Sequence, residues 1–299
     1  MRFFFWRKPL AEPTSPSPRP QRWTWLSGRR ILTNTPYVMP KDAEEGSRLD
    51  LQHHLLKIAA GGLYRAPLRQ PRSILDVACG TGIWGREMAQ EFPRAHIIGF
   101  DIDASLPEKA IEILGPGGRF PQNFRFQVGD ALKAFPFDTG SFDFVHARLI
   151  SPFVPIARWP DVVREMMRVL KPGGVIELVD LWSFPRTPSP AFQPISKLGE
   201  EFFAERGLFV GVGDALPELL AQAGAQQVQQ RTFVLGNDPR QARLLAADML
   251  AGQEHIKPLL VQRGQISAQE FDRLHAQAKV EVPQMGIQMP FVFAFGKKI

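Results

Sequence analysis

Ile74-Leu75-Asp76-Val77-Ala78-Cys79-Gly80-Thr81-Gly82-Ile83-Trp84-Gly85 is the stretch that decides the fold of this chain. It predicts an apolar strand that ends in an acid, then a tight glycine turn, then the start of a helix. Because glycine has no Cβ, such a turn lets backbone N–H groups approach a bound ligand closely. Gly80, Gly82 and Gly85 satisfy the G-x-G-x-x-G pattern of dinucleotide-binding loops, which alone is a weak signal for any one cofactor.

Short apolar strands and amphipathic helices alternate after this stretch. Alternation of this kind indicates a parallel sheet with right-handed crossovers and ligands at the carboxyl ends of the strands. The C-terminal part departs from it, with insertions predicted at 183–212 and 236–288 and the last two strands at 226–235 and 291–296. The earlier strands are predicted at 96–100, 124–128, 142–146 and 175–179, and helices at 84–92, 106–114, 159–170, 214–223, 239–256 and 267–282.

The basic character of the chain is confined to residues 1–30. This segment has seven basic side chains and one acid, so its net charge of +6 equals that of the whole chain. Its proline-rich part, 9–20, cannot form a helix or a sheet interior, and residues 1–30 as a whole are predicted to be a disordered tail. We interpret the tail as a solvated segment, with weak contact to an anionic membrane or a protein partner as the alternative. The neutral remainder gives no electrostatic argument for nucleic acid.

The rest of the chain is divided into an N-terminal helical region, 31–70, and a main domain, 71–299. A helix is predicted over 43–60, where Leu49 and His53 share one face. No apolar run reaches the roughly eighteen residues that predict a membrane span. A single cysteine excludes an internal disulfide, so the cytoplasm is the expected location.

Acidic residues stand at the ends of three predicted strands. Asp76 precedes the glycine turn, and Asp101 follows Gly82 by nineteen residues, where a carboxylate can bind both hydroxyls of a ribose. Asp130 ends the third strand, within reach of an adenine amino group. Leu-Lys-Pro-Gly-Gly at 170–174 then enters the fifth strand through a sharp turn.

These features together resemble the class I S-adenosylmethionine-dependent methyltransferases. Asp-x-x-Cys-Gly-x-Gly at 76–82 matches the family's first motif, and Gly-Phe-Asp at 99–101 and Gly-Asp-Ala at 129–131 match the next two. Dinucleotide enzymes share the glycines and the ribose acid, but have no reason to carry Asp130 or the 170–174 turn. Gly85 then becomes a helix-packing glycine.

The resemblance implies an α/β fold with a seven-stranded doubly wound sheet of order 3-2-1-4-5-7-6 and an antiparallel strand seven. It also implies a lid helix before the sheet and helical insertions after strands five and six. The implied cofactor is S-adenosyl-L-methionine, with S-adenosyl-L-homocysteine as its product. The implied cofactor-binding residues are Asp76, Ala78, Gly80, Gly82, Trp84, Asp101, Ile102, Asp130, Ala131 and His146.

A narrower resemblance is carried by Tyr37-x-x-Pro-x-Asp-x-x-Glu-x-x-Arg-Leu-Asp, by Gln52-His53-His54 and by His146-Ala-Arg148. These stretches are similar to the methyltransferase-like regulators of fungal secondary metabolism and their bacterial relatives. In that group the N-terminal helix packs over the cofactor as a lid. The implied substrate-binding residues are Tyr37, His53, Arg148, Asp180 and Trp182.

Several of these residues have a structural alternative. Asp76 meets the amino group of the cofactor or only braces the turn. His146 ends strand four and is either a general base near neutral pH or an orienting or structural group. Arg148 pairs with a substrate carboxylate or, the preferred interpretation, with Glu45 or Asp50 of the lid. Asp180 and Trp182 line the acceptor pocket or belong to the core.

The acceptor is narrowed by what the sequence lacks. After strand four there is no Asn/Asp-Pro-Pro-Tyr/Phe motif, and a cysteine pair for pyrimidine C5 chemistry is missing. No metal site is indicated by ligand spacing. We therefore expect a small-molecule acceptor, aromatic or natural-product-like, methylated at O, N or C. The phenylalanine-rich insertions suggest an apolar pocket for it, with ordinary packing as the alternative. The alternative is a cofactor-binding regulatory or scaffold protein with little turnover. The sequence makes no prediction of oligomeric state.

Overall fold

A seven-stranded sheet organises the computed structural model, which describes residues 23–26, 29–32, 43–106, 108, 111, 119–208 and 211–299. The strand order is β5-β4-β3-β6-β7-β9-β8, and β9 is antiparallel to both of its neighbours. Counted along the main sheet this is 3-2-1-4-5-7-6, so the predicted topology is confirmed. The strands are β3 Ser73–Val77, β4 His96–Asp101, β5 Phe124–Val128, β6 Phe142–Arg148, β7 Leu170–Leu181, β8 Gln226–Leu235 and β9 Met289–Lys297.

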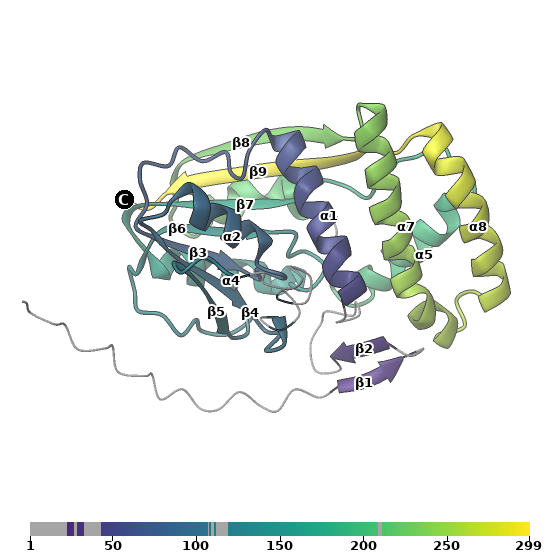
Figure 1. Cartoon of the computed structure of the whole chain (residues 1–299), viewed down its shortest axis with the longest axis horizontal. Coiled ribbons are helices and arrows are strands. Elements are labelled where there is room, and N and C mark those ends of the chain that lie inside the picture. The colour runs from purple at the N-terminus through teal and green to yellow at the C-terminus, as the bar shows by residue number, and fades with distance from the viewer. Residues whose placement is uncertain are drawn as a thin grey trace, which may run out of the picture.

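Helices cover both faces of this sheet (Figure 1). Side chains alternate along β3, so Leu75 packs with α4 and α6 on one face, whereas Ile74 packs with α2 on the other. The helices are α1 Ala43–Ala60, α2 Ile83–Glu91, α4 Trp159–Val169, α5 Phe192–Ala204, α6 Leu216–Gln222, α7 Pro239–Gln262 and α8 Ala268–Met285, with 3₁₀ turns η1 Ile156–Arg158 and η2 Val212–Ala215.

The two insertions form a helical layer beside α1, at one end of the sheet (Figure 1). Leu55 of α1, Phe192 of α5, Leu245 of α7 and Phe271 of α8 belong to one buried cluster, which joins the lid to both insertions. Local signals start the last two helices: Asp238 caps α7, and the Ser267 side chain caps α8.

The ends of several elements differ from the prediction. The lid helix has its predicted bounds, but α7 continues beyond residue 256 and passes through Pro258. Proline removes one helical hydrogen bond, and the complete burial of Leu260 in the last turn favours continuation of the helix. The 170–174 stretch is the irregular start of β7, with Gly173 at φ +78°.

The predicted disorder of residues 1–30 is wrong for their last part. Trp23–Leu26 and Arg29–Leu32 form the antiparallel strands β1 and β2. Residues 1–22 and Tyr37 lie outside the described residues, as does most of the helix predicted at 106–114. None of the described helices combines the length and apolar character that a bilayer crossing requires.

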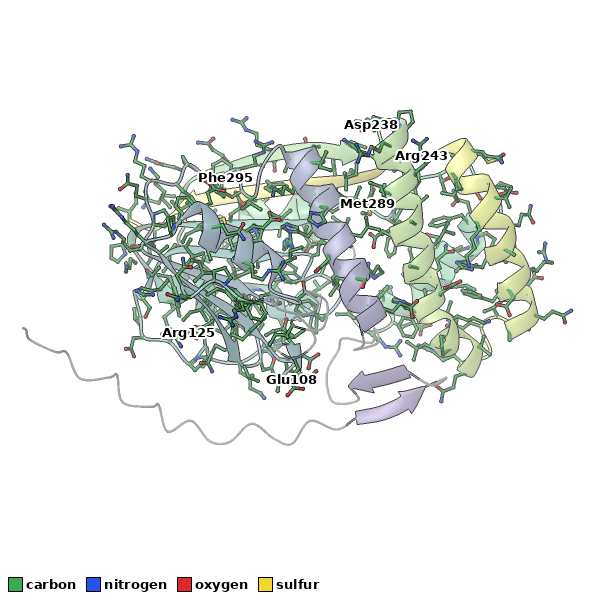
Figure 2. All side chains as sticks on the ribbon, in the orientation of Figure 1. Glu108, Arg125, Asp238, Arg243, Met289 and Phe295 are labelled. Carbon is green, nitrogen blue, oxygen red and sulfur yellow. The ribbon has the colours of Figure 1, made fainter. Side chains whose placement is uncertain are left out.

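Strand β9 connects the two ends of the molecule. Figure 2 labels Met289 at its start, beside α1 and α7, and Phe295 near its other end. Phe295 packs in the core under α2, and Met289 packs with the insertion helices. Met289 lines a cavity, which therefore lies at this end of β9.

Candidate functional site

A cavity of about 300 Å³ lies at the carboxyl ends of the parallel strands. Its size falls within the range of small-molecule sites, about 300–1,000 Å³. One side is built by the glycine turn (residues 78–82) and the ends of β4 and β5, and the other by α1, α5 and α7. The predicted cofactor-binding residues that line it are Asp76, Ala78, Gly80, Asp101, Ile102, Asp130 and Ala131.

The glycine turn is held against β4 by backbone hydrogen bonds. Ala78 and Cys79 donate their N–H groups to the Phe100 carbonyl, at 2.7 and 3.2 Å. Gly80 and Gly82 have φ of +55° and +74°, which favours glycine at both positions. The turn therefore has one rigid conformation that brings its backbone to the cavity wall.

Two glycines of the opening pattern serve packing. A Cβ on Gly82 would stand 2.8 Å from the Phe126 ring, and one on Gly85 would stand 2.4 Å from the Phe124 ring. The packing role of Gly85 is confirmed. Gly82, expected at the cofactor, does not line the cavity among the described residues, because its Cα faces the phenylalanines of β5.

The carboxylates at the ends of β4 and β5 shape the next two loops. Asp101 accepts from the N–H of Gly80 through Oδ2 and from that of Asp103 through Oδ1, both at 3.0 Å. Asp130 Oδ1 accepts from Leu132 N–H at 2.9 Å. Both acids line the cavity, so the backbone holds their carboxylates beside it.

Asp76 is one of the buried acids that line the cavity, with 2% exposure. Its Oδ1 lies 3.0 Å from His146 Nδ1. Its Oδ2 is buried and has no hydrogen-bond partner among the described residues. Because an unpaired buried carboxylate oxygen is costly, this atom favours a ligand that brings a cationic donor.

His146 does not reach the cavity, so its predicted position at the methyl-transfer zone is wrong. It is 1% exposed and stacks on Trp84 at 3.9 Å between ring centroids. In the sheet it pairs with Asp76 on β3 and Glu177 on β7, and the α2 side chains cover this row. Burial lowers the pKa of His146, and the neighbouring Asp76 opposes that shift.

Trp84 is likewise a core residue rather than a cofactor contact. It is 1% exposed, and its indole N–H donates to the Leu63 carbonyl at 2.7 Å. Residue 84 lies in the first turn of α2, and its side chain turns beneath the helix onto His146. The cavity lining in the described part of the chain does not include it.

Arg148 connects the cavity wall to the lid helix. Its Nη1 donates to His53 Nδ1 at 2.8 Å, so the partner on the lid is His53 and not the expected carboxylates Glu45 or Asp50. Burial and the cationic Arg148 lower the pKa of His53 to about 2, which keeps the imidazole neutral and able to accept. Arg148 lines the cavity, whereas the buried His53 does not.

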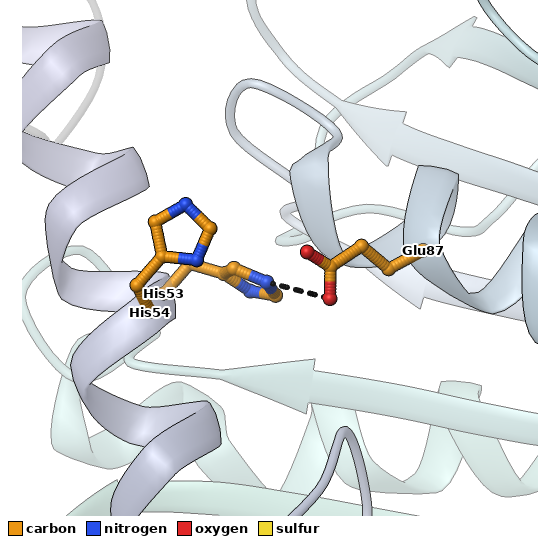
Figure 3. Close-up of side chains that lie close together, drawn as sticks. All are labelled: His53, His54 and Glu87. Atoms are coloured by element: carbon orange, nitrogen blue, oxygen red, sulfur yellow. Dashed lines mark ion pairs between the residues drawn. The ribbon is translucent and has the colours of Figure 1, made fainter.

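A cluster with metal-ligating side chains lies behind this pair (Figure 3). His53, His54 and Glu87 place one ligand atom each within 4.8 Å of one another, and His53 Nε2 is 3.2 Å from Glu87 Oε2. Lys57 Nζ already binds the same carboxylate oxygen at 2.5 Å. With Lys57 and Arg148 beside it, this cluster disfavours a further cation. The absence of a metal stays a prediction.

Asp180 and Trp182 were expected either to line the acceptor pocket or to belong to the core, and the structure does not place them in the cavity lining. Asp180 is 1% exposed, accepts from the Ser151 backbone and hydroxyl at 3.0 and 2.6 Å, and braces the loop after β6. Burial raises its pKa to about 6. Trp182 is 44% exposed and donates to Asp214. Neither residue lines the cavity, whereas Leu181, which lies between them in the sequence, does.

The sequence suggested an apolar pocket formed by the insertions but did not identify the residues that line it. Leu49, on the inner face of the lid helix, also lines the cavity, and its Cδ1 lies 3.5 Å from where a Gly80 Cβ would be. Helices α5 and α7 begin more than a hundred residues after the glycine turn, so no local pattern links them to it. Their lining residues include Phe192, Ile195, Phe203, Met249, Gly252 and Ile256.

Known proteins resemble this chain in sequence and in fold. Residues 74–174 match a methyltransferase domain. The chain is 34% identical over 183 residues to the secondary metabolism regulator LAE1 of Cochliobolus heterostrophus, covering 58% of this chain and 54% of the relative. It is 37% identical over 171 residues to methyltransferase pytC of Aspergillus terreus, covering 55% and 48%. The chain thus spans about half the length of these relatives.

A longer alignment and a solved structure agree with these matches. The secondary metabolism regulator laeA of Gibberella zeae is 29% identical over 265 residues, covering 80% of both chains. The phosphoethanolamine N-methyltransferase 2 of Haemonchus contortus, in complex with phosphomonomethylethanolamine and S-adenosylhomocysteine, has a TM-score of 0.50 at 19% identity. That match covers 85% of this chain and 52% of the other, and it concerns the fold.

Proposed function

We propose that this chain, a member of the class I S-adenosylmethionine-dependent methyltransferases in the branch of the fungal secondary-metabolism regulators, transfers a methyl group to a small-molecule acceptor. One observation carries the proposal: Asp76, whose buried Oδ2 has no hydrogen-bond partner among the described residues, lines a cavity that the glycine turn and Asp101 also line. A cationic amino group, a ribose and an apolar acceptor would each meet suitable partners there.

The residues present fit S-adenosylmethionine. Asp76 Oδ2 would accept from the amino group, and Asp101 would accept from the ribose hydroxyls. Asp130, with the adjoining backbone of Ala131, would meet the adenine. Gly80 would let the methionine part lie close to the turn.

When bound, this cofactor supplies a methyl group on a cationic sulfur, and transfer leaves a neutral thioether. The residues of the chain contribute alignment and exclusion of water, because α1 closes over the turn: Thr81 Oγ1 donates to Asp50 of the lid at 2.5 Å. His146 is too deeply buried to take a proton from the acceptor. The proposed reaction therefore relies on position rather than on this histidine as a base.

Calorimetry with S-adenosylhomocysteine tests the cofactor site. Asp76→Asn keeps the shape of the side chain and removes the charge that meets the amino group, and Asp101→Asn weakens the ribose contact. We expect each change to weaken binding about tenfold or more, the effect of losing a hydrogen bond to a charged group. Asp161→Asn, on the exposed face of α4, is the matched control. Wild-type affinity in the Asp76 and Asp101 variants would refute the assignment.

A second candidate function is regulatory, because two of the similar proteins carry the name secondary metabolism regulator. Incubation of the wild type with methyl-labelled cofactor and a cell extract separates the two. Label transferred to a low-molecular-weight compound supports the enzyme, which would act in the cytoplasm. Cofactor binding without any labelled product would favour the regulator.

A further inference from the structure

The insertion side of the cavity is an apolar chamber, which we define by Phe192, Ile195 and Phe203 of α5 and by Met249, Gly252 and Ile256 of α7. All six residues line the cavity. In α7 the three residues are spaced by three and four positions, and in α5 Phe192 precedes Ile195 by three positions and Phe203 by eleven. These spacings place the three residues of each helix on one face. Two helices from separate insertions thus turn their apolar faces toward the same space, next to the proposed cofactor site.

Gly252 is the position in the chamber wall where the absence of a side chain leaves space. It lies in the interior of α7, where glycine is unfavourable compared with alanine. A Cβ built on Gly252 meets no atom of the described residues within 4 Å, whereas one on Gly199 of α5 would stand 3.1 Å from Ile256. Close packing explains Gly199, but at Gly252 the missing side chain leaves space in the cavity wall.

Two charged side chains that line the cavity at the edge of the chamber, Arg48 and Glu45, are paired with each other. Arg48 donates to Glu45 at 2.8 Å through two nitrogens and to Asp248 at 2.7 Å. His255 Nδ1 lies 2.7 Å from Glu45 Oε2, the oxygen that Arg48 Nε also binds. An ionised acceptor between Gly252 and Gln253 would lose its hydration without gaining a counterion from Arg48, so this part of the chamber favours a neutral molecule.

Gln253 adds one polar group to this apolar wall. It lines the cavity at 5% exposure, and its Oε1 has no hydrogen-bond partner within the described part of the chain. Its Nε2 donates to the Phe192 carbonyl at 3.4 Å. If the Gln253 amide were flipped, its oxygen would face the carbonyl oxygen of Phe192, which is unfavourable. The unpaired atom is therefore the amide oxygen, an acceptor that an O–H or N–H group can satisfy.

We propose that the methyl acceptor is a neutral, largely apolar molecule with an O–H or N–H donor, and that it lies against Gly252 with its donor on Gln253 Oε1. This inference rests on the proposed function and names the substrate class of that site. It makes Gly252 the residue that limits acceptor size and Gln253 the residue that selects for a donor.

Three naphthalene probes test the proposal on protein saturated with S-adenosylhomocysteine. 1-Naphthol is neutral and has a donor, 1-methoxynaphthalene lacks the donor, and 1-naphthoate is an anion. Binding is measured by calorimetry, so no turnover is needed. We expect 1-naphthol to bind about five- to tenfold more tightly than 1-methoxynaphthalene, the value of one hydrogen bond, and 1-naphthoate to bind most weakly.

Two variants test whether the probe binds in the chamber. Gly252→Phe fills the open space and should weaken 1-naphthol at least tenfold while leaving S-adenosylhomocysteine affinity unchanged. Gln253→Leu should remove the preference for 1-naphthol over 1-methoxynaphthalene. Ala247→Phe adds the same ring to an exposed position of α7 and should bind all probes as the wild type does. Circular dichroism and retained S-adenosylhomocysteine binding confirm that each variant is folded.

The outcomes separate this inference from the proposed function. Loss of S-adenosylhomocysteine binding in the wild type would refute both. With that binding intact, wild-type affinity of Gly252→Phe for 1-naphthol would overturn the position of the acceptor. Equal or tighter binding of 1-naphthoate, or no binding of 1-naphthol to the wild type, would overturn the substrate class.

Discussion

At the scale of single residues, Asp76 connects the interior of the sheet to the cavity. One oxygen accepts from His146, and the other is buried and has no hydrogen-bond partner in the part of the chain that the structure describes. Because the pKa of His146 is lowered, the imidazole is neutral at neutral pH and its Nδ1 carries the proton that Asp76 accepts. Trp84 stacks on the imidazole and fixes its orientation. His146 is therefore a positioning residue for the Asp76 carboxylate, which we propose binds the cofactor.

Replacement of His146 should lower the affinity for the cofactor rather than alter the pH dependence of turnover. His146→Leu leaves Asp76 Oδ1 without its donor, at a cost of about 1–3 kcal/mol, so we expect S-adenosylhomocysteine to bind about tenfold more weakly. His146→Asn presents an amide N–H near the position of Nδ1 and should recover most of the affinity. Titration calorimetry measures both, and wild-type affinity in the leucine variant would contradict the positioning role.

At the scale of elements, helix α1 joins the glycine turn to the insertions. Its Asp50 accepts from Thr81 of the turn, and its Arg48 binds Asp248 of α7. Leu55 packs in the insertion core. The lid is thus anchored at both sides of the cavity by polar contacts and along its length by apolar ones.

The Arg48 cluster should dominate the polar contribution to lid docking. Arg48→Met leaves the buried carboxylates of Glu45 and Asp248 without their shared counterion, and breaking such a buried pair costs about 3–5 kcal/mol. Urea unfolding should give a correspondingly lower midpoint. Arg273→Met, which breaks an exposed pair with Glu270 on α8, is the control and should keep the wild-type midpoint. Equal midpoints in the two variants would contradict the anchoring role.

At the scale of the whole molecule, buried titratable groups link stability to pH with opposite signs. The pKa of His53 is lowered from 6.5 to about 2, so its contribution to stability is complete above pH 6.5 and is lost as the pH falls below that value. Burial raises the pKa of Glu177 from 4.5 to about 7, so this group favours the folded state as the pH falls through 7 toward 4.5. The two effects oppose each other in the wild type.

A His53→Asn variant isolates one of these effects. Asparagine can accept from Arg148 but does not titrate, so the variant avoids the cost of a histidine that must stay neutral. Between pH 7 and pH 5 its unfolding free energy, relative to the wild type, should rise by about 2 kcal/mol. Urea unfolding at the two pH values measures this, with exposed His54→Asn as the control. A difference that does not change with pH would contradict a buried neutral His53.

The sequence by itself determined the alternating α/β pattern, the helix at 43–60 and the cofactor side of the cavity, and the resemblance to the class I methyltransferases implied the order of the strands. Strand periodicity and the spacing of Asp76, Gly80, Asp101 and Asp130 are local properties, and the strands bring these residues to one edge because parallel strands end together. Those four residues line the cavity as expected.

Only the tertiary structure decided what lies behind and opposite that edge. His146 ends a strand in the sequence, but whether it reaches the cavity depended on Trp84, sixty-two residues earlier, folding over it. The chamber at Gly252 depended on α5 and α7 packing across separate insertions. Side-chain contacts between distant segments leave no periodic pattern in the chain, so the physical packing of the whole molecule had to specify them.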